Sequence, residues 1–226
     1  METVIINIMG KAINGANGPI SGKVGSVVFC KWKGIDYVRS LPRINRNRKP
    51  TQSQAKQRSK FSFMQEMLSP VVPFVRLGFM NYAPNRTGHN SAMSYNLKEA
   101  VSEEEGGYTL VYEKFTFSKG ILPAPKEAQA VREGDYVRFT WKYNPKDEKE
   151  SVNIRNRTLL LLYLDGEITF ATGKQFGSYR HEGYDQIEIP NGVKAGSTFH
   201  AYIAFFAEDG SNNSSDSVYA GAIEIQ

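Results

Sequence analysis

The chain has 226 residues, enough for one large domain or for one domain with a substantial arm. With 40% hydrophobic and 23% charged residues, we expect a packed core, and wholesale disorder is excluded. The net charge of +5 is unevenly placed, because residues 1–100 hold 15 of the 28 basic residues and only 4 of the 23 acidic ones. This asymmetry is typical of a basic arm attached to an acidic domain.

Residues with catalytic or metal-binding chemistry are few. Cys30 is the single cysteine, and the three histidines, His89, His181 and His200, are far apart in the sequence. A disulfide framework and a cysteine-rich metal site are therefore excluded, and we expect no cofactor and no enzymatic activity. No apolar run approaches the roughly 18 residues of a membrane span, and no secretory signal is visible. These features favour a cytoplasmic or virion location without a membrane span.

The N-terminal region predicts turns followed by a hairpin. Residues 10–25 contain five glycines and one proline, which favour turns. Residues 24–32 and 35–40 are rich in β-branched and aromatic residues, and Lys33-Gly34 between them predicts a turn. An isolated hairpin is marginally stable in water, so we expect this one to pack on the rest of the chain or on a partner.

A basic segment, residues 31–60, follows within and after the hairpin. It holds ten cations opposed by a single acidic residue, Asp36. Such a segment suits contact with phosphates or with an acidic protein surface, and two aromatic side chains in it are suited to stacking. The candidate binding residues are Lys31, Lys33, Arg39, Arg43, Arg46, Arg48, Lys49, Lys56, Arg58 and Lys60, with Trp32 and Tyr37.

A helical region is predicted next. Thr51 and Gln54 form a capping-box pattern at the start of a helix over residues 52–69, which Pro70 should end. Phe61, Met64 and Leu68 fall on one face of this helix. Residues 73–80 and 91–100 predict two shorter helices, and residues 103–107 predict a loop or linker.

The remainder reads as about seven short strands with turns between them, over residues 108–117, 135–143, 158–164, 168–171, 184–189, 198–207 and 218–225. Residues 135–143 alternate cleanly, with Val137, Phe139 and Trp141 on one face. This number of strands in about 115 residues is typical of a β-sandwich.

Two resemblances extend this interpretation. The segment Val137–Trp141 resembles the second strand of fibronectin-type-III or immunoglobulin-like domains, and residues 184–199 and 199–210 resemble the turn into the sixth strand and that strand itself. The segments SGKVGSVVFCKWKGIDYVRSLP, KPTQSQAKQRSKF and SDSVYAGAIEI are similar to an uncharacterised family frequent in bacteroidete genomes. The second resemblance implies a Gly-rich, basic N-terminal module joined to a β-domain, and it implies no activity.

The expected fold is mainly β with a small helical segment. A Gly-rich arm, hairpin and basic strap occupy residues 1–50, short helices and a linker occupy 51–107, and an Ig/FnIII-like antiparallel β-sandwich occupies 108–226. The first functional hypothesis is a structural assembly protein, in a virion or another multi-subunit particle, whose basic arm docks on a neighbouring subunit or an acidic partner. The alternatives are nucleic-acid binding through residues 31–60, and carbohydrate or surface binding through loops 144–156 and 208–216.

Overall fold

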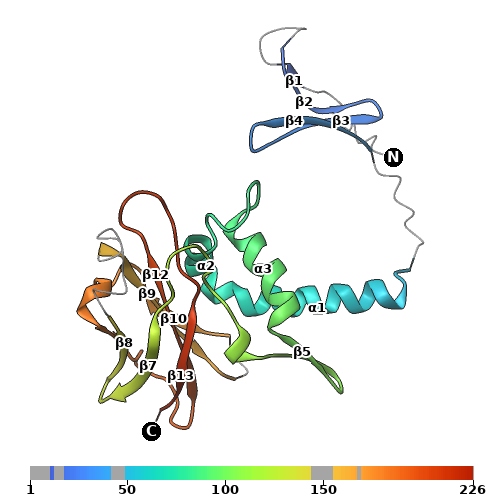
Figure 1. Cartoon of the computed structure of the whole chain (residues 1–226). Coiled ribbons are helices and arrows are strands. Elements are labelled where there is room, and N and C mark those ends of the chain that lie inside the picture. Colours follow the sequence, from blue (N-terminus) through green and yellow to red (C-terminus); the bar gives the residue numbers. More distant parts are fainter. Residues whose placement is uncertain (1–10, 13–17, 42–48, 144–154, 167–168, 226) are drawn as a thin grey trace. The chain divides into compact units, whose positions relative to one another are not determined.

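The computed structural model describes residues 11–12, 18–41, 49–143, 155–166 and 169–225 (Figure 1). The chain forms two compact units, residues 1–51 and residues 52–226. Each unit is described separately below. The fold is mainly β, as predicted, with several antiparallel sheets and a smaller helical part.

The N-terminal unit contains an antiparallel sheet in the order β1-β2-β3-β4. The predicted hairpin is confirmed, since β3 and β4 pair around Lys33-Gly34, whose φ angles of 47° and 85° fit a type I′ turn. Contrary to the turns that its glycines predict, residues 20–24 form a strand that pairs with β3. The strands are β1 (Lys11–Ala12), β2 (Ile20–Val24), β3 (Val27–Trp32) and β4 (Ile35–Ser40).

The predicted helices are present. They are α1 (Gln52–Leu68), the 3-10 turn η1 (Ser69–Val71), α2 (Val72–Gly78) and α3 (Gly88–Glu99). Pro70 does not end the helical path, because it lies in the first turn of η1, where a proline sacrifices no internal hydrogen bond. Of the three residues that were placed on one face of this helix, Met64 and Leu68 are buried and Phe61 is 48% exposed.

The segment after α3 differs from its prediction. Residues 103–107 belong to a hairpin of β5 (Val101–Glu104) and β6 (Gly107–Leu110), and not to a linker. The strand expected over residues 108–117 is also wrong, because β6 ends at Leu110 and the 3-10 turn η2 (Tyr112–Lys114) follows. The aromatic side chains of this segment, Phe115 and Phe117, are instead buried beneath the helices.

In the described part of the chain, seven strands form a two-sheet sandwich. Seven strands were predicted, but the one expected over residues 108–117 is not among them. The three-stranded sheet has the order β11-β8-β7, and the four-stranded sheet has the order β10-β9-β12-β13. The first of these strands, β7, is one that the sequence did not indicate. The strands are β7 (Lys126–Glu133), β8 (Tyr136–Lys142), β9 (Arg157–Leu164), β10 (Ala171–Lys174), β11 (Tyr184–Glu188), β12 (Thr198–Phe206) and β13 (Val218–Glu224).

The four-stranded sheet carries a hydrophobic core on each face. Between the two sheets, Phe139 and Trp141 of β8 pack with Leu160 and Leu162 of β9. On the opposite face, Leu161 and other residues of β9 and β12 pack against the helices. Figure 1 shows α2 and α3 beside this sheet. Both faces of β9 are buried, so its successive side chains do not alternate between core and solvent. This explains the nearly continuous apolar sequence of the strand.

Candidate functional site: the N-terminal sheet

The N-terminal sheet, β1–β4, exposes large apolar side chains on both of its faces. Residues that pair across an antiparallel ladder point to the same face, so the register assigns each side chain. Every residue of β4 is exposed, and no residue of β2 or β3 is fully buried. Within the described residues, this unit therefore lacks the covered face that normally stabilises a sheet.

One side of the sheet is named here the aromatic face. Trp32 pairs with Ile35 and Cys30 pairs with Tyr37, so these four side chains share a face with Val28. Trp32, Ile35 and Tyr37 are 49%, 56% and 45% exposed. The cations Lys23 and Arg39 pair with Val28 from either side and flank this patch. The aromatic face thus combines stacking surfaces with positive charge.

The opposite side, named here the aliphatic face, carries almost no charge. Phe29 pairs with Val38, and the exposed residues Ile20, Val24 and Val38 lie on this face. Its single described ion pair joins Lys31 and Asp36, whose Nζ and Oδ1 atoms are 4.0 Å apart on an exposed surface. A surface of this composition is suited to another apolar protein surface and offers little to a phosphate backbone.

The structure brings only some of the predicted binding residues together. Trp32, Tyr37 and Arg39 share the aromatic face, Lys31 lies on the aliphatic face, and Lys33 occupies the turn. Arg43, Arg46 and Arg48 lie outside the described residues, and Lys49 is exposed in a segment without regular structure. Lys56, Arg58 and Lys60 belong to α1 in the second unit.

Lys56 has a partner within its own unit. Its Nζ lies 2.6 Å from Oε1 of Glu103 on β5, and Tyr108 donates its hydroxyl to the Lys56 carbonyl oxygen at 3.2 Å. The Glu103 carboxylate raises the pKa of Lys56. Arg58 lies farther along α1 beside the exposed ring of Phe61, where the two side chains line an open hollow. Lys56 therefore holds the β5–β6 hairpin against α1 as well as contributing surface charge.

The sequence reasoning missed the apolar part of this surface. The exposed residues Ile20, Val24, Ile35 and Val38 were not among the candidates, although β3 and β4 carry apolar residues at both odd and even positions. Such a pattern indicates a strand that is covered on both sides. In the described residues of the N-terminal unit no such cover is present, so these apolar side chains lie on the surface of that unit.

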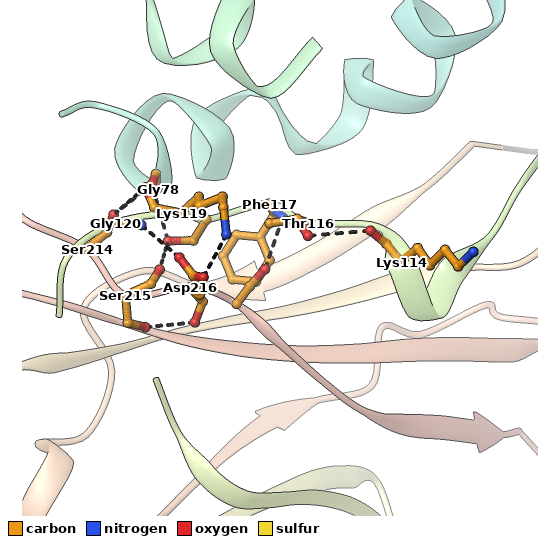
Figure 2. Close-up of polar contacts among 11 residues, drawn as sticks. Gly78, Lys114, Thr116, Phe117, Lys119, Gly120, Ser214, Ser215 and Asp216 are labelled. Atoms are coloured by element: carbon orange, nitrogen blue, oxygen red, sulfur yellow. Dashed lines mark hydrogen bonds and ion pairs between the residues drawn. The ribbon is translucent and has the colours of Figure 1, made fainter. Parts of the chain in front are cut away.

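A buried polar network in the second unit serves the fold. The Gly78 carbonyl oxygen accepts from Ser214 Oγ at 2.7 Å (Figure 2) and from Ser118 Oγ at 3.3 Å. Lys119 Nζ lies 2.7 Å from Oδ2 of Asp216, whose other oxygen accepts from the Gly120 amide at 3.1 Å. These contacts fasten the end of α2 to the loop before β13. All of these serine hydroxyls donate to backbone oxygens, so we assign the network a structural role.

His200 on β12 is the one buried histidine of the described chain. Its ring stacks on Tyr112 at 3.7 Å, and its Nδ1 lies 2.9 Å from the Tyr219 hydroxyl. Its Nε2 is buried without a hydrogen bond, 3.7 Å from a carboxylate oxygen of Asp165. Burial lowers the pKa of His200, and the nearby Asp165 and Glu113 carboxylates oppose that shift. The neutral imidazole is therefore favoured in the folded protein.

This histidine predicts a pH-dependent stability. Because the pKa of His200 is lower when folded than its value of about 6.5 when unfolded, the unfolded chain binds the extra proton. We expect the free energy of unfolding, measured by urea titration, to decrease as the pH falls below about 6.5. His200→Gln should reduce this slope, whereas His181→Gln, at an exposed position, should retain it. An unchanged slope in His200→Gln would contradict the assignment.

Other chemistry is sparse in the described part of the chain. No group of three or more His, Cys, Asp or Glu side chains there could hold a metal ion. None of the described helices has the length and apolar character needed to cross a bilayer. Cys30 is a half-buried free thiol on the aromatic face.

The fold and the surface together define a protein of two units, a four-stranded N-terminal sheet and a helix-covered β-sandwich. The chain belongs to a protein family of unknown function (DUF6266), whose model matches residues 19–221. The match begins one residue before β2 and ends within β13, so it spans both units. No curated protein matches the sequence. The predicted membership of an uncharacterised family is confirmed.

Proposed function

We propose that the protein is a structural assembly protein whose N-terminal sheet docks on a neighbouring subunit. The observation that carries this proposal is the exposure of large apolar side chains on both faces of the sheet. A nucleic-acid-binding surface needs one aromatic and basic face, and the aliphatic face has no part in such a role. Protein surfaces of a multi-subunit particle, such as a virion, would cover both faces.

The magnitudes indicate how much contact the sheet needs. Covering a half-exposed valine, isoleucine, tryptophan or tyrosine contributes roughly 1 kcal/mol. Each face exposes three such residues, whereas association costs about 4–15 kcal/mol in lost freedom. The apolar contacts of one face are therefore too few, and stable docking requires both faces or additional hydrogen bonds.

The test compares the full chain with a variant that lacks residues 1–50. The second unit has its own two hydrophobic cores, so the shortened variant should fold with an unchanged unfolding transition. We expect the full chain to form oligomers by light scattering and the shortened variant to be monomeric. An equal number of chains per particle in the two proteins would contradict the proposal, as would a monomeric full chain.

Nucleic-acid binding is the second candidate, and the aromatic face favours it. Trp32 and Tyr37 are about half exposed beside Arg39 and Lys23, a combination suited to stacking bases and contacting phosphates. If this function holds, a single-stranded oligonucleotide should bind with an affinity that decreases steeply as salt is added. For the third hypothesis, a carbohydrate module, residues 144–154 lie outside the described part, and Ser214 and Ser215 of the other loop are buried.

A further inference from the structure

Strand β4 forms an open edge of the N-terminal sheet. Among the described strands it pairs only with β3, and that ladder has no register shift from Ile35 to Ser40. The strand has no proline and no bulge, two of the devices that protect an edge from pairing, although it carries the charged residues Asp36 and Arg39. Its outer backbone groups are therefore available to another strand.

The turn determines which backbone groups of β4 point outward. In a two-residue hairpin the residues that flank the turn, Trp32 and Ile35, form a hydrogen-bonded pair. Odd-numbered residues of β4 then bond to β3, in agreement with the Leu41 amide, which donates to the Ser26 carbonyl oxygen at 2.9 Å. The amide and carbonyl groups of Asp36, Val38 and Ser40 consequently point away from the sheet.

Two copies of this edge are complementary in one register. If a twofold axis perpendicular to the sheet relates the two copies, each face of the sheet continues from one copy into the other. With such an axis, one residue of β4 must pair with the same residue of the second copy. If that residue is Val38, then Asp36 pairs with Ser40 of the second copy, and all three outward positions form hydrogen-bonded pairs. The same register places Tyr37 opposite Arg39 of the second copy, which is a favourable cation–π arrangement on the aromatic face.

The neighbouring register is poorer. If Tyr37 pairs with its own copy, Asp36 lies opposite Val38 and Arg39 lies opposite Ile35. Only two outward residues then find partners within β4, and both charges face apolar side chains. The register centred on Val38 therefore has more hydrogen bonds and the better side-chain pairs.

We propose that two copies of the chain associate through β4, antiparallel and centred on Val38, to form one continuous sheet. The inference rests on the proposed assembly function and specifies its partner as a second copy. Three pairs of outward residues give six backbone hydrogen bonds, each worth about 0.5–1.5 kcal/mol net. Edge pairing leaves both faces of the sheet open, so these backbone bonds and the side-chain pairs beside them, and not contacts between faces, would hold the two copies together.

A cysteine scan of the full chain tests the register. In a Cys30→Ser background, the variants Asp36→Cys, Tyr37→Cys, Val38→Cys and Arg39→Cys are oxidised mildly and resolved on a non-reducing gel. Paired Cα atoms at Val38 would lie about 5.5 Å apart, within disulfide range, whereas residue 37 or 39 meets its own copy only diagonally at about 7–8 Å. We expect Val38→Cys to form the linked dimer at least about tenfold faster than the others.

Charged substitutions at Val38 provide a second test of the proposed pairing. Val38→Glu and Val38→Lys should each be monomeric, because like charges meet at the axis, and an equimolar mixture should form heterodimers. Val131→Glu is the matched control, since Val131 is an exposed valine on β7, outside the N-terminal sheet. It should dimerise as the unchanged chain does, as judged by light scattering.

The outcomes separate the two proposals. If the unchanged chain is oligomeric but Val38→Cys links no faster than Tyr37→Cys, edge pairing is wrong and docking by another surface stands. If Val131→Glu dissociates the oligomer as well, or the Val38 mixture fails to restore it, edge pairing is again overturned. A monomeric unchanged chain overturns both proposals. Unchanged resistance of the N-terminal unit to limited proteolysis verifies that each variant keeps its sheet folded.

Discussion

Replacing Asp185 by alanine should lower the free energy of unfolding by about 3–5 kcal/mol, the largest single-site effect that we expect. Its carboxylate, in a side chain only 3% exposed, accepts from Lys174 Nζ at 2.7 Å and from Thr158 Oγ1 at 2.6 Å. It also accepts from the amides of Ser178 and Gln186, both at 2.8 Å. Alanine would leave four donors without this partner in a site that water cannot easily refill.

Chemical denaturation at pH 7 provides the measurement, with Asp185→Asn as an intermediate case that keeps one oxygen acceptor. The control is Glu188→Ala, which removes an exposed carboxylate from the same strand, β11, and should change stability by less than about 0.5 kcal/mol. Equal losses for Asp185→Ala and Glu188→Ala would refute the role of the buried network. The hydrogen bonds also lower the pKa of Asp185 against the opposing effect of burial, so its contribution is lost as the pH falls below about 4.

The second large effect concerns Gly78, the last residue of α2. A β-carbon there would lie 2.4 Å from the carbonyl oxygen of Phe117 and 2.6 Å from the Cα of Ser118. Both are backbone atoms that cannot move independently, so Gly78→Ala must push α2 away from this segment. We expect a loss of about 2–3 kcal/mol in unfolding free energy, despite the better helix propensity of alanine.

A matched glycine provides the comparison for this variant. Gly107, the first residue of β6, has no atom within 4 Å of the position of an added β-carbon, and its φ is not positive. Gly107→Ala should therefore unfold at the same denaturant concentration as the unchanged protein. If Gly78→Ala did so as well, the close packing of α2 on residues 117–118 would not be a constraint on the fold.

Much of the sandwich could be predicted because its strands alternate or are continuously apolar. The alternation of β8 correctly placed Phe139 and Trp141 in the core. Strand β7 escaped prediction because its sequence, KEAQAVRE, is largely charged and packs inward through two alanines. Residues 108–117 were mistaken for a strand because their aromatic residues fit β propensity equally well, and only tertiary packing turns Phe115 and Phe117 beneath the helices.

The candidate surface could be predicted only in part. Charge is visible in a sequence, so the cations and the aromatic residues Trp32 and Tyr37 were identified. Exposure is not visible in a sequence, because an apolar residue such as Val24 or Val38 would normally be assigned to the core. Only the structure shows that these two side chains are exposed. The pairing of Lys56 with Glu103 likewise depends on a hairpin that meets α1 from 47 residues away in the chain.

Because both faces of the four-stranded sheet are buried, the two hydrophobic cores of the second unit share one backbone. Strands β9 and β12 contribute alternate side chains to both cores, with Leu160 facing one and Leu161 the other. A defect in the helical layer therefore shifts the same backbone that supports the opposite layer. We therefore expect the helical layer and the opposite sheet to unfold together in one transition.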